Sequence, residues 1–132
     1  MDRLFLDANV LFSVAYKTQT RLIQLWKFED VVLCSSRYAL QEARANLPDK
    51  DQQLRLNKLS SVLHLFEAKG KLPGGVSLPE KDVPILLAAI EAGATHLLTG
   101  DVQHFGPYFD QEIEGIEIAL PGKYLRMRAS ER

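Results

Sequence analysis

The sequence predicts an α/β fold, a three-layer α/β/α sandwich with a central, mostly parallel sheet. Short apolar segments of strand length alternate along the chain with longer segments of helical periodicity. This alternation is typical of parallel sheets that are covered by helices on both faces. The 132 residues suffice for one hydrophobic core. We therefore expect a single domain that spans residues 1–132.

The first third of the chain predicts two strands separated by two helices. Residues 3–6 form a short apolar strand, and residues 8–16 change to the spacing of a helix. Thr20 is a suitable N-cap for a second helix over residues 20–26. The β-branched run of residues 31–34 has the length of a strand.

Helices dominate the middle of the sequence. Ser35 and Ser36 are favourable caps for the next helix, which Pro48 ends because proline disfavours the α conformation in the residue before it. Residues 49–65 carry leucines at helical spacing, and we expect a further helix there. The lysine- and glycine-rich residues 69–75 are expected to form a loop.

The last third predicts two strands and two helices. Residues 83–92 have the clearest helical pattern, and Gly93 is the expected stop in the left-handed conformation. Residues 95–98 form a buried strand, and residues 116–118 form a weaker one. A terminal helix is expected around residues 123–128.

Composition narrows the class of protein. A hydrophobic content of 46% and a charged content of 25% are ordinary for a globular domain. No run approaches the roughly 18 apolar residues of a membrane span, and Cys34, the single cysteine, fits a reducing compartment. We expect a soluble, cytoplasmic protein without a membrane partner. The net charge of −1 gives no general attraction to nucleic acid, so such binding would need a local patch.

Four carboxylates stand at or near the ends of the predicted elements. Asp7 and Asp101 follow strands, and Asp82 precedes a helix. In a parallel sheet these ends meet at the carboxyl edge, where ligands bind. Glu42 lies at the margin of the apolar stripe of its helix and could reach the same edge. Taken singly, each has an ordinary explanation as an N-cap, a turn residue or a solvated charge.

Taken together, the four carboxylates predict a metal site. Two carboxylates ~4 Å apart repel by about 4 kcal/mol at an effective dielectric constant of 20. A cluster of three or four therefore needs a cation or shared protons. Oxygen ligands without cysteine or clustered histidine select hard ions such as Mg²⁺ or Mn²⁺.

Two segments resemble the PIN-domain nucleases, a family that includes VapC-type toxins. The first is Leu-Asp-Ala-Asn-Val-Leu at residues 6–11, and the second, more specific one spans residues 78–105. The resemblance covers nearly the whole chain. It implies a compact α/β/α sandwich, metal-dependent hydrolysis of phosphodiester bonds in RNA, a homodimer and a cognate antitoxin.

The resemblance also assigns residues to the site. It implies an acidic quartet supported by two polar residues, as follows: Asp7, Glu42, Asp82 and Asp101, with Asn9 and Thr99 beside them. Asp7, Asp82 and Asp101 would bind one or two Mg²⁺ or Mn²⁺ ions, while Glu42 would complete the coordination or orient a water molecule. Family members often have another acid just after the last aspartate, where residues 102–104 are Val-Gln-His. A second metal position is therefore expected to be weak, or to fill only with substrate phosphate.

Basic and aromatic residues are the candidates for contacts with RNA. Arg37 is favoured because it starts the helix that carries Glu42, and helix N-termini attract phosphate. Lys17 is a second candidate, and His104 is close enough to Asp101 in sequence to contact substrate. Arg44 and Lys81 are further basic candidates, and Tyr16, Tyr38 and Phe105 are candidates for base stacking.

Two other functions remain open from the sequence. A non-catalytic nucleic-acid-binding or scaffold module could keep the same fold, although it would have no use for clustered negative charge. A phosphatase of the haloacid-dehalogenase type would require an aspartate at Asn9. A dinucleotide-binding domain is excluded because no Gly-x-Gly-x-x-Gly turn follows the first strand.

The second predicted helix suggests how two copies could associate. Within residues 20–26, the apolar residues occupy an arc too broad for one narrow core-facing stripe; they are Leu22, Ile23, Leu25 and Trp26. An exposed apolar patch of this kind marks a partner site, and a symmetric pair is the commonest solution. We therefore expect a homodimer that buries part of this helix.

Overall fold

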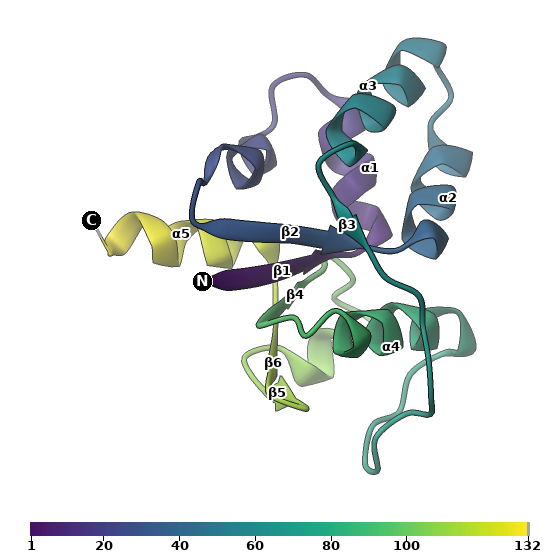
Figure 1. The fold of residues 1–132 in the computed structure, drawn as a ribbon, viewed down its shortest axis with the longest axis vertical. Helices are drawn as coiled ribbons and strands as arrows, with labels where there is room; N and C mark the ends of the chain where they lie inside the picture. Colours follow the sequence, from purple (N-terminus) through teal and green to yellow (C-terminus); the bar gives the residue numbers. More distant parts are fainter. Residues whose placement is uncertain (132) are drawn as a thin grey trace.

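The computed structural model describes residues 1–131 and shows the expected α/β fold, with helices on both sides of a six-stranded sheet (Figure 1). The strands are β1 (Asp2–Leu6), β2 (Val31–Ser35), β3 (His64–Leu65), β4 (His96–Leu98), β5 (Glu112–Ile113) and β6 (Ile116–Ala119). Their order across the sheet is β3-β2-β1-β4-β6-β5. Neighbouring strands are parallel except β5 and β6, which pair antiparallel, so the predicted mostly parallel sheet is confirmed.

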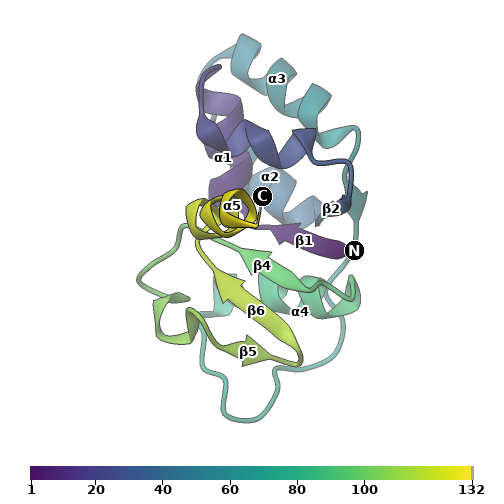
Figure 2. The same ribbon diagram turned by 90° about the vertical axis from the view of Figure 1, so that its left-hand side faces the viewer.

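Helices pack on both faces of the sheet. They are α1 (Ala8–Tyr16), α2 (Arg37–Asn46), α3 (Lys50–Ser60), α4 (Val83–Glu91) and α5 (Pro121–Ser130), with short 3-10 helices η1 (Arg21–Lys27), η2 (Glu80–Asp82) and η3 (Gly106–Tyr108). The first three α-helices lie together on one side and α4 lies on the other (Figure 1). Helix α5 packs against η1 (Figure 2). No helix within residues 1–131 combines the length and the apolar character needed to cross a bilayer.

The order in which the chain adds strands to the sheet reverses beside β1. β1 pairs in parallel with both β2 and β4. The chain proceeds outward from β1 to β2 and β3, and then returns to β4 on the other side of β1. The carboxyl ends of β1 and β4 therefore flank the topological switch point, which is where open α/β sheets form their ligand sites.

The two strands at this point run through the core. Leu4, Phe5 and Leu6 of β1 are fully buried, as are Leu97 and Leu98 of β4. Consecutive buried residues require cover on both faces of the sheet, and this explains why these segments are continuously apolar instead of alternating. The polar residues that directly follow these strands are thus attached to well-packed backbone.

Several helix ends have the predicted caps. The Ser36 hydroxyl oxygen accepts a hydrogen bond from the Ala39 N–H at 3.1 Å, whereas Ser35 ends β2 and donates to the Leu6 carbonyl oxygen at 2.8 Å. Gly93 follows α4 with a φ of +63°. This left-handed conformation confirms the predicted helix stop.

The helix predicted over residues 49–65 is wrong at its C-terminal end. Helix α3 stops at Ser60, and His64–Leu65 form β3, which pairs in parallel with the end of β2. The hydroxyl groups of Ser60 and Ser61 donate to carbonyl oxygens three residues earlier. Such local bonds compete with helix propagation, and a two-residue strand leaves no periodic signal in the sequence.

The predicted second helix is a 3-10 helix, η1, and it begins at the predicted cap. The Thr20 hydroxyl oxygen accepts a hydrogen bond from the Leu22 N–H at 3.3 Å. Leu25 is fully buried, whereas Trp26 is half-buried and its indole N–H donates to the Leu59 carbonyl oxygen at 3.0 Å. Part of the apolar surface of η1 therefore packs against the rest of the same chain. The homodimer through this helix stays a prediction.

Candidate metal centre

The four carboxylates singled out from the sequence line one pocket of about 620 Å³. Asp7 follows β1, Asp101 follows β4, Asp82 immediately precedes α4, and Glu42 lies on α2. The pocket thus opens at the topological switch point. Its lining also includes Lys81, together with Asn9, Phe12, Asn46, Gly100, Gln103 and His104.

Asp7 is buried and held by three hydrogen-bond donors. Its Oδ1 accepts from the Ala8 N–H at 2.7 Å, and its Oδ2 accepts from the Thr99 hydroxyl at 2.7 Å and from the Asn9 amide at 3.2 Å. Burial raises the pKa of Asp7 from 3.8 to about 6, against the opposing effect of the Thr99 and Ala8 hydrogen bonds; repulsion from Asp82 and Glu42 adds to the rise. Asp7 caps α1 and also contributes an ionisable oxygen to the pocket.

Thr99 and Asn9 connect the ends of the two central strands. The buried Thr99 hydroxyl, besides donating to Asp7, accepts hydrogen bonds from the Asp101 N–H at 3.1 Å and the Asn9 amide at 3.3 Å. The Asn9 side-chain oxygen accepts from the Gly100 N–H at 2.7 Å. A β-carbon at position 100 would lie only 3.3 Å from that oxygen, so glycine allows this close approach.

Asp82 occupies the N-cap position of α4 without capping it. Its carboxylate makes no hydrogen bond to the first turn of the helix, where Pro84 also lacks the N–H that a cap could satisfy. The residue is only 7% exposed. Burial is the largest cause of its raised pKa, followed by repulsion from Asp101, while His104 and Lys81 oppose the rise. The ordinary explanation of Asp82 as a helix cap therefore fails.

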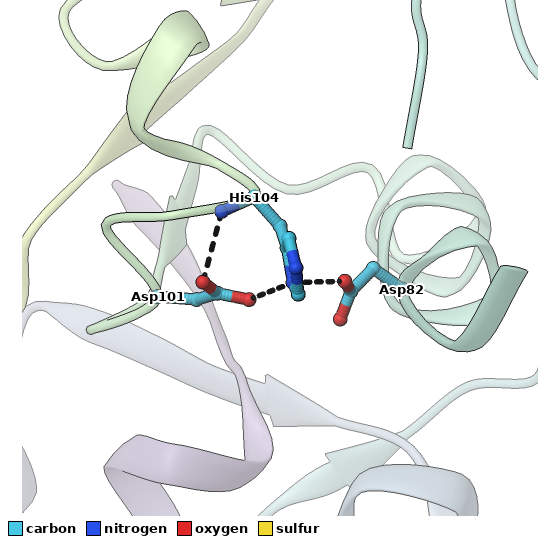
Figure 3. A group of neighbouring side chains, drawn as sticks. All are labelled: Asp82, Asp101 and His104. Atoms are coloured by element: carbon cyan, nitrogen blue, oxygen red, sulfur yellow. Dashed lines mark hydrogen bonds and ion pairs between the residues drawn. The ribbon is translucent and has the colours of Figure 1, made fainter. Parts of the chain in front are cut away.

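His104 lies between the carboxylates of Asp82 and Asp101 (Figure 3). Its Nδ1 is 2.9 Å from Asp82 Oδ2 and 3.0 Å from Asp101 Oδ2, and its backbone N–H donates to Asp101 Oδ1 at 3.0 Å. The Nδ1–Asp101 Oδ2 contact has the geometry of a hydrogen bond when Nδ1 carries the proton. In the other tautomer the proton is on Nε2, and Nδ1 has a free lone pair. Within residues 1–131, Asp82 Oδ2 is left as a buried side-chain oxygen without a hydrogen-bond donor.

A divalent cation fits this part of the pocket. Ligand atoms from Asp82, Asp101 and His104 all lie within 4.8 Å of one another. With all four carboxylates ionised and His104 neutral, the lining carries a formal charge of −3, because Lys81 is its one lysine or arginine. A cation bound beside Asp82 Oδ2 would offset the free-energy cost of burying a carboxylate oxygen without a well-aligned donor.

Glu42 lies at the exposed side of the same pocket. It is on α2, one turn after Tyr38, whose hydroxyl donates to the Lys81 carbonyl oxygen at 2.7 Å. Asp7 and Glu42 are not in the tighter group formed by Asp82, Asp101 and His104 within the described residues. The pocket therefore has a compact inner end and a carboxylate at its mouth.

The structure does not bring two of the predicted substrate contacts to the pocket. Lys17 lies beyond the end of α1, in a separate hollow beside Arg21. Arg37 lines another hollow and forms an exposed ion pair with Glu67, at 3.7 Å. Lys81, a weaker candidate in the sequence, is the basic residue that lines the acidic pocket.

The place of His104 between two carboxylates was not predicted from the sequence, although His104 was a candidate contact for substrate. It depends on the turn after β4, which the hydrogen bond between the His104 N–H and Asp101 closes. The next residue, Phe105, is fully buried, as is usual for an aromatic core residue, and it fixes the end of this turn. The sequence signal that could have indicated this position is the spacing of three residues between Asp101 and His104.

Comparisons with known proteins give the fold independently. No protein-family model and no curated protein sequence matches the chain. Among solved structures, the chain is similar to a chain in the crystal structure of VapBC2 from Rickettsia felis bound to a DNA fragment from their promoter. The TM-score is 0.63 at 17% sequence identity, over 89% of this chain and 98% of that chain. At this identity the likeness establishes a shared α/β fold.

Proposed function

We propose that this protein is a metal-dependent ribonuclease that hydrolyses phosphodiester bonds in RNA. The observation that carries the proposal is the group formed by ligand atoms of Asp82, Asp101 and His104, within 4.8 Å of one another, inside a pocket lined by four carboxylates. A pocket with this charge repels an anionic substrate unless a cation is bound, and hydrolysis of a phosphodiester makes use of such a cation. The resemblance of the sequence to PIN-domain nucleases supports RNA as the substrate.

Asp82 and Asp101 are the proposed inner ligands of Mg²⁺ or Mn²⁺, and Asp7 is the third acidic ligand. When bound, the metal ion would polarise the scissile phosphate and lower the pKa of a water molecule. Thr99 keeps Asp7 in place through its 2.7 Å hydrogen bond and so fixes the distance between the two central strands at the site. Glu42, at the mouth of the pocket, would orient the attacking water.

Lys81 and His104 are the proposed contacts for the phosphate at the cleavage position. Both line the pocket, and the Lys81 ammonium would neutralise charge on the substrate. Lys17 and Arg37 lie outside the pocket, so they would contact RNA only at nucleotides away from the cleaved bond. Asn9 would act indirectly, because its side chain bonds to Asp7 and Gly100.

We further propose that the protein is the toxin of a toxin–antitoxin pair. Two observations favour this role: the sequence resembles VapC-type toxins, and the fold is shared with a chain of the VapBC2 complex. In this role a cognate antitoxin would block the acidic pocket, and two copies of the chain would associate through the helix that carries Trp26.

Cleavage of a labelled RNA tests the proposal, with a DNA of the same sequence as a second substrate. We expect the parent protein to cut RNA with Mg²⁺ or Mn²⁺ and to lose activity in EDTA. Asp101→Asn should reduce cleavage at least 100-fold, whereas Glu29→Gln, which changes an exposed carboxylate outside the pocket lining, should leave it unchanged. RNA binding without cleavage by the parent would instead support the non-catalytic module, and preferential cleavage of DNA would refute the substrate class.

A further inference from the structure

The inner end of the pocket offers a nitrogen atom as well as carboxylate oxygens. His104 Nδ1 faces Asp82 Oδ2 at 2.9 Å and Asp101 Oδ2 at 3.0 Å (Figure 3). The Asp82 oxygen is buried, and within residues 1–131 no donor meets it with good hydrogen-bond geometry, although His104 Nδ1 lies 2.9 Å away. The ring lies where it can help the two carboxylates to hold a cation.

We propose that His104 is a metal ligand, so that one imidazole nitrogen joins carboxylate oxygens of Asp82 and Asp101 in binding the ion. The inference deepens the proposed function, on which it rests, because it concerns the metal of the same pocket. It replaces the all-oxygen ligand set expected from the sequence with a mixed nitrogen and oxygen set.

The distances agree with this arrangement. In an octahedral complex with bonds of about 2.1 Å, adjacent ligand atoms are about 3.0 Å apart. The nitrogen of His104 has this separation from both carboxylate oxygens, at 2.9 Å and 3.0 Å. With the imidazole proton on Nε2, Nδ1 has a free lone pair, and an ion could bind all three atoms after small shifts of the side chains.

The loop also holds the ring in position. The His104 N–H donates to Asp101 Oδ1 at 3.0 Å, and the neighbouring Phe105 side chain is fully buried. The His104 side chain is itself only 23% exposed. A ligand whose backbone and ring are already fixed loses little conformational freedom when the metal binds.

A nitrogen ligand changes which metal the pocket prefers. Imidazole suits transition-metal ions, whereas Mg²⁺ strongly prefers oxygen ligands and retains its water. The proposed set therefore favours Mn²⁺ over Mg²⁺. We expect the parent protein to bind Mn²⁺ at least tenfold more tightly than Mg²⁺.

Electron spin-echo spectroscopy of the Mn²⁺-loaded protein tests the inference without relying on activity. The parent should show modulation from a directly bound ¹⁴N nucleus. His104→Asn, which puts an amide in place of the ring, should lose this modulation, and His104→Ala should weaken Mn²⁺ binding at least tenfold while changing Mg²⁺ binding less than threefold. His64→Asn is the matched control, because His64 is exposed on β3 and does not line the pocket.

Each result separates the inference from the proposed function. Mn²⁺ bound without nitrogen modulation, or modulation that persists in His104→Asn, overturns His104 as a ligand; metal-dependent cleavage of RNA would still support the nuclease. Equal losses of Mn²⁺ and Mg²⁺ affinity in His104→Ala also overturn it. A parent that binds neither ion refutes both proposals. Thermal melting, monitored by circular dichroism, shows whether each variant folds. If His104→Ala fails to fold, the spin-echo spectrum of His104→Asn decides whether His104 is a ligand.

Discussion

Asp7 couples the stability of the fold to the chemistry of the pocket. Its carboxylate is 4% exposed yet surrounded by donors from Ala8, Thr99 and Asn9. The raised pKa of about 6 means that the folded state favours the protonated form. The stabilising contribution of this protonation is fully present below pH 3.8 and is lost as the pH rises through 6.

Asp7→Asn should therefore gain stability relative to the parent as the pH rises. Between pH 4 and pH 7, in EDTA, we expect the difference in unfolding free energy to change by about 2.4 kcal/mol, because each pKa unit corresponds to about 1.4 kcal/mol and a small part of the effect is already present at pH 4. Urea denaturation at a series of pH values measures this difference, with Glu29→Gln, a change of an exposed carboxylate outside the pocket lining, as the control. A pH-independent difference for Asp7→Asn would show that Asp7 is not a strained buried acid.

The end of α4 gives a prediction at the scale of an element. Gly93 has a φ of +63°, which a residue with a β-carbon adopts only at a cost of roughly 1–2 kcal/mol. Gly93→Ala should lower the unfolding free energy by about 1 kcal/mol. Gly74→Ala is the control, because a β-carbon at Gly74 meets no atom within 4 Å and Gly74 lacks a positive φ. Equal stabilities of the two variants in chemical denaturation would contradict this account of the helix stop.

The strands and helices with a strong periodic or β-branched signal were predictable from the sequence. β1, β2, β4 and α4 fall within a residue or two of their predicted ranges. Elements that depend on distant partners were not. β3 is two residues long and exists because β2, distant in the sequence, offers it backbone hydrogen bonds, which no local pattern reveals. β5 is equally short, and although its partner β6 follows directly after the turn at Glu114 and Gly115, two residues give no periodic signal.

The residues of the candidate site also divide into those that a local sequence signal located and those that it did not. The acids next to strong elements could be located in advance, because the ends of parallel strands share one edge of the sheet. The position of His104 depends on a turn closed by Asp101, and the separation of Lys17 and Arg37 from the pocket depends on the path of whole helices. Sequence spacing alone does not define these three-dimensional relations.

Association of two chains is a prediction at the scale of the whole molecule. Ile23 of η1 is half-exposed and, unlike its neighbours Leu22 and Trp26, is not among the side chains packed against the core. It is therefore the apolar residue of this helix most available to a second copy. We expect light scattering to show a dimer for the parent and a monomer for Ile23→Lys.

Gln24→Lys adds the same charge at an exposed position of the same helix, and it should remain dimeric if Ile23 itself lies in the contact. A monomeric parent at micromolar concentration would refute the homodimer. A parent dimer that persists in Ile23→Lys would move the contact to another surface.

Anomalous diffraction from crystals grown with MnCl₂ tests most directly the claim that the acidic pocket is a metal centre. We predict a manganese peak between the Asp82 and Asp101 carboxylates, at the switch point between β1 and β4, with occupancy lost in Asp101→Asn. A Mn²⁺-saturated crystal with no peak in this pocket, or with its only peaks at other carboxylates, would contradict the account.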